Sequence, residues 1–402
     1  VAFGTKIIRS YHDFENPVTD LGEVMKSLRK TGFEIPKVAF MPKSLSDVTR
    51  LYEQSNEITD YEHIVLAMGP LGQSSRILAP KFNSFLTYTC PENADLSVLG
   101  QIDPITLNET YHFRSINDKT EIFGVTGWPL KVTSSPALHN AGYEKHGKNA
   151  VYVPIRGENI DQVIDFSHKL GVKGLSVTVP HKNSVLNFVE EKNCSEIVKK
   201  IGATNTLVFG DCAENDRKIS AYNTDVVGFR RSLLEFLGYG DCAEKMSPLK
   251  RRTVLKHKKV AILGAGGAAK AIAYVVSELG GKACIFNRTI SKAMELAKDY
   301  DFKYSSLGIE SQSILFKYSD LIIQTTSIGL GVAENSLSTN ENDPIPFYQF
   351  TGKEKVFDVI YEPVKTPILL RAEKAGCEVC NGENMLKYQG YEQFRFYTGE
   401  DY

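Results

Sequence analysis

The feature of this sequence that most constrains its fold is the stretch Lys259–Thr289, which reads KVAILGAGGAAKAIAYVVSELGGKACIFNRT. A short apolar run, Val260–Leu263, precedes closely spaced glycines, a periodic apolar segment and a second apolar run, Ala283–Phe286. This order predicts strand, glycine turn, helix and strand, the context in which a G-x-G-x-x-A motif indicates dinucleotide binding. Glycine lets the backbone approach a pyrophosphate, and the helix N-terminus offers it free N–H groups. The residues expected to bind the cofactor at this turn are Gly264, Gly266, Gly267 and Ala268.

The end of the second predicted strand indicates which dinucleotide is bound. Proteins that bind NAD usually carry Asp or Glu there, for the ribose 2′-hydroxyl. This sequence has Asn287, Arg288 and Thr289 instead. A guanidinium can pair with a 2′-phosphate through two hydrogen bonds, and the neighbouring amide and hydroxyl can donate to it as well. We therefore predict NADP as the cofactor.

Length and composition limit the class of protein. A chain of 402 residues predicts two or three domains, and 42% hydrophobic with 24% charged residues is typical of soluble globular proteins. A net charge of −1 argues against a nucleic-acid or membrane-surface partner. The seven cysteines are odd in number and scattered, which favours a reducing compartment. Cys377 and Cys380 form a C-x-x-C without a second pair, so no metal is expected.

The first part of the chain alternates predicted strands and amphipathic segments. This rhythm is typical of βα units in a parallel sheet or barrel. Four units are found, whereas a closed (β/α)8 barrel needs eight strands. The strands are expected at Lys6–Tyr11, Lys37–Met41, His63–Met68 and Phe85–Thr89.

Polar residues occur where a barrel would place its chemistry. His12 ends the first strand, and Lys37 opens the second among apolar neighbours. Burial should lower the pKa of such a lysine and make it a candidate Schiff-base nucleophile, with the histidine moving protons. Arg76 follows the third strand and Gln101 the fourth. Taken singly, a strand-end histidine also fits a structural role, and a lysine in a strand often extends its charged end to solvent.

The motifs SYHDF, IPKVAFMP, AMGPLGQSSR and LGQI, in this order, resemble the C-terminal half of type I 3-dehydroquinate dehydratase. The resemblance implies that Lys37 is the Schiff-base lysine, His12 the general acid and base, and Arg76 the carboxylate clamp. It also places Ser97 and Gln101 in a loop that covers the substrate. The family's first four strands, which supply a glutamate partner of the histidine, have no counterpart in this sequence. Either they lie upstream or on another chain, or the segment is a vestige.

Further polar residues end the strands of the middle segment. In GWPLKVTSSPALHN, the hydroxyls of Thr133 and Ser135 come just before a helix that starts at proline, where they suit a carboxylate or ordinary capping. LSVTVPHK, IGATNTL and AYNTD place Lys182, Asn205 and Asp225 at strand ends. A lysine and an aspartate together can hold a substrate hydroxyl and pass a proton, although each alone fits a turn.

From about residue 121 to 398 the chain resembles shikimate dehydrogenase, through SVTVPHK, IGATNT, YNTD, GAGGAAKA, TTSIGL, DVIYEPVKTPIL and NGENMLKYQ. The resemblance implies that Lys182 and Asp225 form the catalytic pair, and that Thr326 and Ser327 lie on the nicotinamide loop. Ser176 stands where the family has asparagine. The residues that the resemblance assigns to shikimate are Thr133, Ser135, Thr178, Asn205, Tyr361 and Gln389.

The sequence thus predicts an α/β protein: the C-terminal half of a (β/α)8 barrel, then a two-domain shikimate dehydrogenase with a Rossmann NADP-binding domain. We expect NADPH-dependent reduction of 3-dehydroshikimate to shikimate, fused to Schiff-base dehydration of 3-dehydroquinate. The alternatives are a dehydrogenase with an inactive dehydratase segment, and a non-catalytic regulator that senses quinate or shikimate. We expect small-molecule substrates, no nucleic-acid or membrane partner, a monomer or homodimer, and a cytoplasmic or, in a plant-like source, plastid location. The expected domains are 1–118, 121–235 and 236–375, with a C-terminal helix in 376–402 that returns to the substrate domain.

Overall fold

The structure is a computed structural model that describes residues 4–91, 100–130, 133–210, 218–240 and 246–402. Its contacts divide the chain into two compact units. The first unit is Val1–Asn193 with Thr206–Ala221, and the second is Cys194–Asn205 with Tyr222–Tyr402. Within the described residues, no helix is both long enough and apolar enough to cross a membrane.

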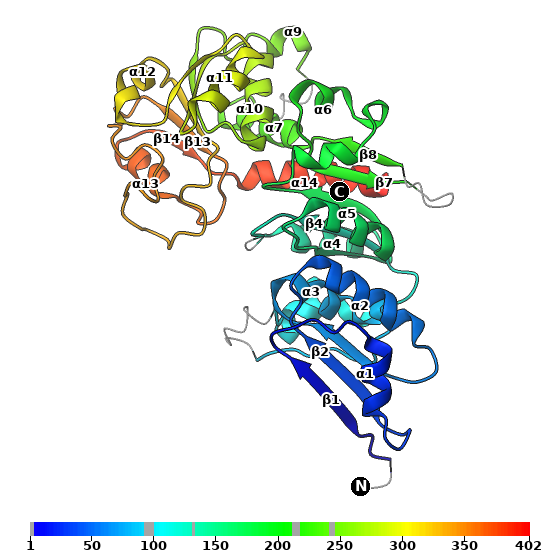
Figure 1. Ribbon diagram of the computed structural model, residues 1–402. Helices are drawn as coiled ribbons and strands as arrows, with labels where there is room; N and C mark the ends of the chain where they lie inside the picture. The colour runs from blue at the N-terminus through cyan, green and yellow to red at the C-terminus, as the bar shows by residue number, and fades with distance from the viewer. Residues whose placement is uncertain (1–3, 92–99, 131–132, 211–217, 241–245) are drawn as a thin grey trace. The chain divides into compact units, whose positions relative to one another are not determined.

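The first unit begins with a three-stranded parallel sheet in the order β1-β2-β3 (Figure 1). Helix α1 starts where the side chain of Asp20 accepts a hydrogen bond from the Glu23 N–H, and it buries Leu21 and Met25. Strands β1, β2 and β3 confirm three of the four strands predicted for this part of the chain. The bounds are β1 (Ile8–Asp13), α1 (Leu21–Leu28), β2 (Ile35–Phe40), α2 (Leu45–Glu57), β3 (Ile64–Ala67) and α3 (Gly69–Ile77).

The fourth strand, predicted at Phe85–Thr89, is wrong, because this segment is irregular in the structure. The hydroxyl of Ser84 accepts a hydrogen bond from the Val65 N–H at 3.0 Å and donates to the Leu86 carbonyl at 3.0 Å. The Ser84 side chain thus bonds the Val65 N–H, a backbone group of β3 with which a fourth strand would have paired. Phe85 still donates its N–H to the His63 carbonyl at 2.7 Å, so the segment begins beside β3 and then leaves the sheet.

A second sheet of the first unit has five strands in the order β5-β4-β6-β7-β8, with β7 antiparallel to β6. Helix α5 packs against α2, and Lys169 pairs with Glu53 at 2.9 Å. The bounds are β4 (Glu121–Thr126), α4 (Ser135–Lys145), β5 (Ala150–Pro154), α5 (Ile160–Leu170), β6 (Val172–Val177), β7 (Thr206–Phe209) and β8 (Ile219–Tyr222).

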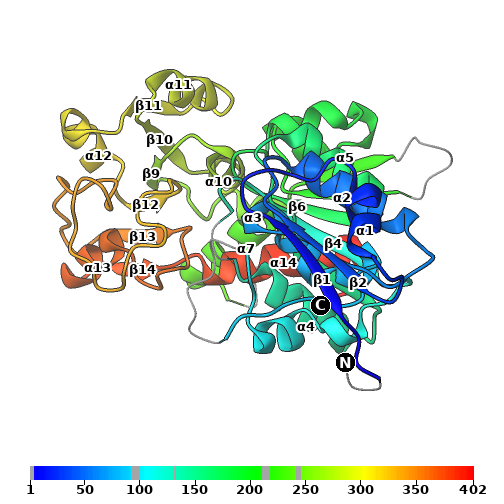
Figure 2. The ribbon, with the colours of Figure 1, turned by 60° about the horizontal axis from the view of Figure 1, so that its bottom comes forward.

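The second unit contains a six-stranded sheet in the order β11-β10-β9-β12-β13-β14 (Figure 2). Every recorded pairing in it is parallel, as the doubly wound prediction requires. Alternate residues of the central strand enter two separate cores: Val260 and Ile262 one, Ala261 and Leu263 the other. Both faces of the sheet are therefore covered, as expected for parallel strands. The strands are β9 (Lys259–Leu263), β10 (Lys282–Asn287), β11 (Lys303–Ser306), β12 (Leu321–Gln324), β13 (Lys355–Asp358) and β14 (Glu378–Cys380).

The helices of the second unit complete this arrangement. Helix α7 packs on both α10 and α14, and α10 also contacts α6. The predicted C-terminal helix is confirmed as α14, whose contacts with α7 are the most extensive between any two elements. The bounds are α6 (Glu196–Ile201), α7 (Asp225–Phe236), α9 (Pro248–Arg251), α10 (Gly267–Glu278), α11 (Ile290–Lys298), α12 (Gln312–Lys317), α13 (Pro367–Lys374) and α14 (Glu383–Thr398).

Candidate active site

The predicted dinucleotide turn lies between β9 and α10. Gly264 has φ of +113°, and a Cβ there would collide with the hydroxyl of Thr325, so this position requires glycine. Gly266 differs, because a Cβ at that exposed position would meet no atom of the chain within 4 Å. The backbone here leaves open space at the N-terminus of α10, which begins at Gly267 with Ala268 in its first turn. These residues fit a pyrophosphate.

The adenosine end of the site is the loop after β10. Asn287 is the last residue of β10, and its side-chain amide donates to the Thr289 carbonyl at 2.9 Å. This hydrogen bond closes the turn that leads into α11, and it leaves Arg288 and Thr289 exposed. An exposed guanidinium in a turn without a carboxylate fits a 2′-phosphate.

The loop Thr325–Leu330 follows β12, the neighbour of β9 in the sheet. The hydroxyl of Thr325 donates to the Leu263 carbonyl at 2.7 Å, which ties the start of this loop to the end of β9. Thr326 is half-buried and Ser327 is exposed. The loop therefore lies beside the glycine turn, where the nicotinamide end of a dinucleotide would be expected.

The second unit gathers several of the predicted substrate residues around Asn205. Its side-chain amide donates to Oδ1 of Asp225 at 2.9 Å, to the hydroxyl of Thr224 at 2.9 Å and to Oε1 of Gln389 at 3.3 Å. Its Oδ1 accepts the Thr224 N–H at 2.8 Å. Gln393 of α14 donates to the Asn205 carbonyl at 3.1 Å. Asn205 thus joins the first turn of α7 to α14 in a buried polar group.

Asp225 is the first residue of α7 and Gln389 lies in the middle of α14. Both side chains are buried, and Gln389 also donates to the Leu386 carbonyl at 3.0 Å. Tyr361, the remaining predicted substrate residue of this unit, is half-buried in the segment between β13 and α13. Thr224 and Gln393 are not among the residues predicted from sequence, although Thr224 stands in the motif AYNTD.

The first unit holds the other predicted substrate residues. The hydroxyl of Thr133 donates to that of Ser135 at 3.2 Å, at the start of α4. Ser135 in turn hydrogen-bonds Tyr152, whose hydroxyl donates to Ser176 at 2.6 Å. Burial raises the pKa of the fully buried Tyr152, so this phenol stays neutral and a donor. Tyr152 was missed because an apolar strand such as VYVP gives no functional signal.

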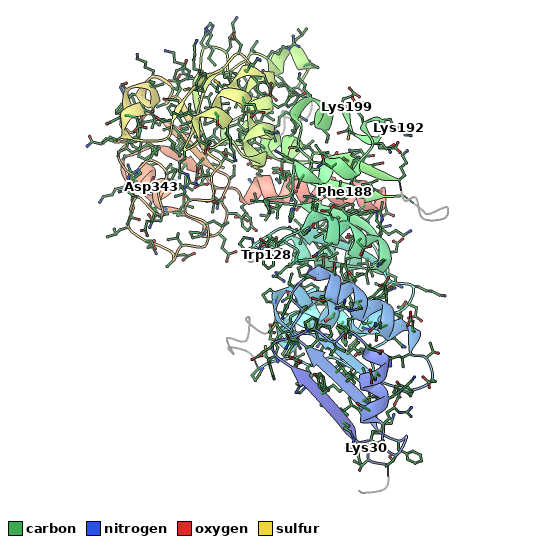
Figure 3. All side chains as sticks on the ribbon, in the orientation of Figure 1. Lys30, Trp128, Phe188, Lys192, Lys199 and Asp343 are labelled. Atoms are coloured by element: carbon green, nitrogen blue, oxygen red, sulfur yellow. The ribbon has the colours of Figure 1, made fainter. Side chains whose placement is uncertain are left out.

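Two loops of the first unit run together beyond β4 and β6. The Thr178 N–H donates to the Thr126 carbonyl at 2.9 Å, and the N–H of Trp128, labelled in Figure 3, donates to the Val179 carbonyl at 3.0 Å. His181 bonds the Gly157 carbonyl at 2.8 Å, and the half-buried Lys182 follows it. The predicted pair of Lys182 and Asp225 has one member in each unit, so it stays a prediction.

The predicted dehydratase residues lie on the three-stranded sheet and the helix after it. Lys37 is opposite Ser10 in the register, so Lys37 and His12 share one face of the sheet. Burial lowers the pKa of Lys37, and the charge of Arg76 lowers it further, in the direction expected from the sequence. Burial and then Lys37 lower the pKa of His12. Burial also lowers the pKa of Arg76 to about 10.

One residue near Lys37 was not predicted. The ring of Tyr88 lies 3.9 Å from Nζ of Lys37, which favours the ammonium form and opposes the effect of burial. Gln101 is half-buried, and the preceding Gly100 passes so close to the Gly69 carbonyl that a Cβ would collide with it. Ser97 lies outside the described residues. In the part of the chain that the structure describes, no cluster of His, Cys, Asp and Glu is arranged to hold a metal ion.

The fold and these residues define an α/β protein with a three-stranded parallel sheet, a buried polar group around Asn205 and a Rossmann-type dinucleotide domain. Comparison with known families agrees. Residues 1–118 match the type I 3-dehydroquinase model, and residues 125–207 match the shikimate dehydrogenase substrate binding domain. Residues 247–343 match the shikimate / quinate 5-dehydrogenase model.

Individual relatives define the family. The chain is 34% identical over 287 residues to the shikimate dehydrogenase (NADP(+)) of Pyrococcus furiosus. The aligned region covers 71% of this chain and 93% of that protein. The crystal structure of shikimate dehydrogenase from Aquifex aeolicus matches with a TM-score of 0.58 and 29% identity, over 71% of this chain and 96% of that one. The chain therefore belongs to the shikimate dehydrogenase family.

A further relative extends over the half barrel as well. The bifunctional 3-dehydroquinate dehydratase/shikimate dehydrogenase, chloroplastic, of Arabidopsis thaliana is 32% identical over 398 residues, which is 98% of this chain and 63% of that protein. The chain thus spans less than two thirds of the length of this relative. Together with the family models, this match confirms both resemblances seen in the sequence.

Proposed function

We propose that the protein reduces 3-dehydroshikimate to shikimate with NADPH. The observation that carries this proposal is the buried hydrogen-bonded group of Asn205, Asp225 and Gln389, in a member of the shikimate dehydrogenase family. The glycine turn and Arg288 support NADP, which the name of the Pyrococcus furiosus relative also carries.

The proposed chemistry adds a hydride to the ketone carbon and a proton to its oxygen. NADPH, held by the glycine turn and Arg288, supplies the hydride. Lys182 donates the proton as the carbonyl oxygen gains negative charge, and Asp225 holds the substrate hydroxyl and the lysine in position. Asn205 fixes Asp225 through its 2.9 Å hydrogen bond, so the carboxylate needs no rearrangement before the reaction.

We propose that Thr133 and Ser135, at the start of α4, hold the substrate carboxylate, since hydroxyls and free N–H groups at a helix N-terminus suit an anion. Thr178, Tyr361 and Gln389 hold the ring hydroxyls in this proposal. An analogue that lacks one of these hydroxyls would leave the matching side chain without a hydrogen-bond partner. This loss gives the site its specificity.

A second proposed activity is dehydration of 3-dehydroquinate at the half barrel. The lowered pKa of Lys37 favours it, because a neutral amine is the form that attacks a ketone. Lys37 forms an iminium and releases water, His12 removes the adjacent C–H proton, and the substrate hydroxyl leaves as water. Hydrolysis of the iminium then frees 3-dehydroshikimate and regenerates the amine. In this proposal Arg76 holds the carboxylate, and Gln101 covers the substrate.

Fusion of the two activities would hold the intermediate near its second site and raise its effective concentration. We place the protein in the cytoplasm or, in a plant-like source, in the plastid, as the name of the Arabidopsis thaliana relative suggests. In this proposal it acts as a monomer or homodimer on small molecules.

Steady-state assays of the natural polypeptide test both activities. Lys182→Ala should abolish NADPH-dependent reduction of 3-dehydroshikimate while the circular dichroism spectrum stays that of the wild type. Unchanged turnover in this variant would refute the assignment. Reduction without dehydration would indicate that the dehydratase segment is inactive, and binding of shikimate without either reaction would indicate a sensor.

A further inference from the structure

Two polar residues of the second unit are fully buried at the carboxyl ends of adjacent strands. Gln324 ends β12 and Asp358 ends β13, and the two are direct partners in the strand register. Both have 0% exposure. Neither side chain can therefore contact a bound ligand directly, and whatever they do for the site must act through the segments that they hold.

Gln324 holds the loop that carries the predicted nicotinamide residues. Its Oε1 accepts the Thr326 N–H at 2.9 Å. Its Nε2 donates to the Ile328 carbonyl at 2.9 Å and to the Thr326 carbonyl at 3.3 Å. One side chain thus satisfies three backbone groups of a short turn, which sets the course of the backbone around Thr326 and Ser327.

Asp358 holds the segment that carries Tyr361 in a similar way. Its Oδ1 accepts the Ile360 N–H at 2.9 Å, and its Oδ2 accepts the hydroxyl of Thr366 at 2.6 Å. Thr366 is the residue before α13. Both ends of the segment from residue 360 to 366 are therefore fixed to one carboxyl group, with Tyr361 between them.

The two segments also contact each other. The Gly331 N–H donates to the Glu362 carbonyl at 3.2 Å. A Cβ on Gly329, whose φ is +100°, would lie 3.5 Å from the side chain of Thr366. Because Val359 N–H also bonds the Gln324 carbonyl at 3.0 Å, the strands and the segments beyond them form one connected piece.

We propose that Gln324 and Asp358 are paired positioning residues that fix the nicotinamide loop and the Tyr361 segment relative to each other. This inference rests on the proposed function, because it assigns these segments to cofactor and substrate. It explains why the strands LIIQ and KVFD each end in a fully buried polar residue. An apolar residue would bury equally well but would leave these loop groups without their present partners.

Two substitutions of similar volume test the proposal: Gln324→Met and Asp358→Leu. The affinity for NADPH is measured by quenching of nicotinamide fluorescence, and KM for 3-dehydroshikimate is measured at saturating NADPH. Because the segments are connected, each variant should weaken both quantities, by about ten-fold if one to two hydrogen bonds are lost. Asp358→Asn, which keeps an acceptor for Ile360 and a polar partner for Thr366, should recover most of the loss.

The matched control is Glu354→Leu, at the residue directly before β13. Glu354 is buried and accepts hydrogen bonds from the Thr351 N–H at 3.0 Å and the Tyr348 hydroxyl at 2.8 Å, so its loss disturbs the turn that leads into β13, away from Asp358. It should lower the unfolding midpoint without changing the affinity for NADPH or KM. Thr366→Val, which removes one hydroxyl, serves if Asp358→Leu does not fold.

The outcomes separate cleanly. The paired role is wrong if the affinity for NADPH and KM for 3-dehydroshikimate match the wild type in all folded variants. It is also wrong if Gln324→Met changes only the affinity for NADPH and Asp358→Leu changes only KM. If the wild type binds NADPH but does not reduce 3-dehydroshikimate, the proposed function fails, while the fluorescence titration still tests whether Asp358 acts on the nicotinamide loop.

Discussion

Asn205→Leu is the most informative perturbation of the second unit, because one side chain is replaced by an apolar one of similar size. The variant removes the hydrogen bond that Asn205 donates to the Asp225 carboxylate at 2.9 Å and the one that it accepts from the Thr224 N–H at 2.8 Å. All three residues are buried. A buried group that loses its partner costs about 1–3 kcal/mol, so the free energy of unfolding should fall by about 2–6 kcal/mol. The activity should fall as well, because Asp225 is no longer held in place.

Urea denaturation followed by fluorescence measures this loss, with kcat/KM for 3-dehydroshikimate measured on the folded protein. The matched control is Gln393→Met, which removes a hydrogen bond of 3.1 Å to the Asn205 carbonyl and should cost about 1 kcal/mol. If Asn205→Leu costs no more than the control, the polar group does not hold the start of α7, and the reasoning is wrong. A large loss of stability with unchanged kcat/KM would instead refute the link from Asn205 to Asp225.

Three further predictions concern the other sites. Arg288→Glu should raise KM for NADPH by at least about ten-fold and leave KM for NADH nearly unchanged, because it places a carboxylate where a 2′-phosphate is expected; steady-state kinetics with both cofactors checks this. Borohydride in the presence of 3-dehydroquinate should attach one substrate-derived group to the wild type and none to Lys37→Arg, as read by intact mass. Burial, with a smaller contribution from nearby Asp343, raises the pKa of Asp358 from 3.8 to about 7, so the folded state retains this proton longer than the unfolded state. The stability from Asp358 should therefore be present below about pH 4 and be lost as the pH rises towards about 7, and urea midpoints across this range should be flatter in Asp358→Asn.

The dinucleotide domain could be predicted from sequence because its evidence is local. The glycines that the turn requires, the strand before them and the helix after them lie within one short stretch, and the structure reproduces each. The polar residues at strand ends could be predicted for the same reason. Asn205 directly precedes β7 and Asp225 comes shortly after β8, so both could be chosen from their positions next to strands without knowledge of distant contacts.

The parts that could not be predicted depend on contacts between distant side chains. The segment Phe85–Thr89 has the composition of a strand, but the Ser84 hydroxyl takes a backbone group of β3 and the segment leaves the sheet. Tyr152 looks like an ordinary core residue until its hydroxyl is seen to bond Ser176. Gln324 and Asp358 read as ordinary last residues of strands, and their role depends on which loop groups lie within reach.

The distinction between local evidence and contacts of distant residues also applies to how the chain is divided between the two units. The chain leaves the second unit after Asn205 and returns to it at Tyr222. These crossing points are hydrogen-bonded to each other: the Asn205 N–H donates to the Tyr222 carbonyl at 3.3 Å, and the hydroxyl of Thr204 donates to the same carbonyl at 2.6 Å. Asn223 closes the connection by donating to the Ala203 carbonyl at 3.0 Å. The hydrogen bonds described around Asn205 therefore all lie within the second unit, where they join its chain crossing to α7 and α14.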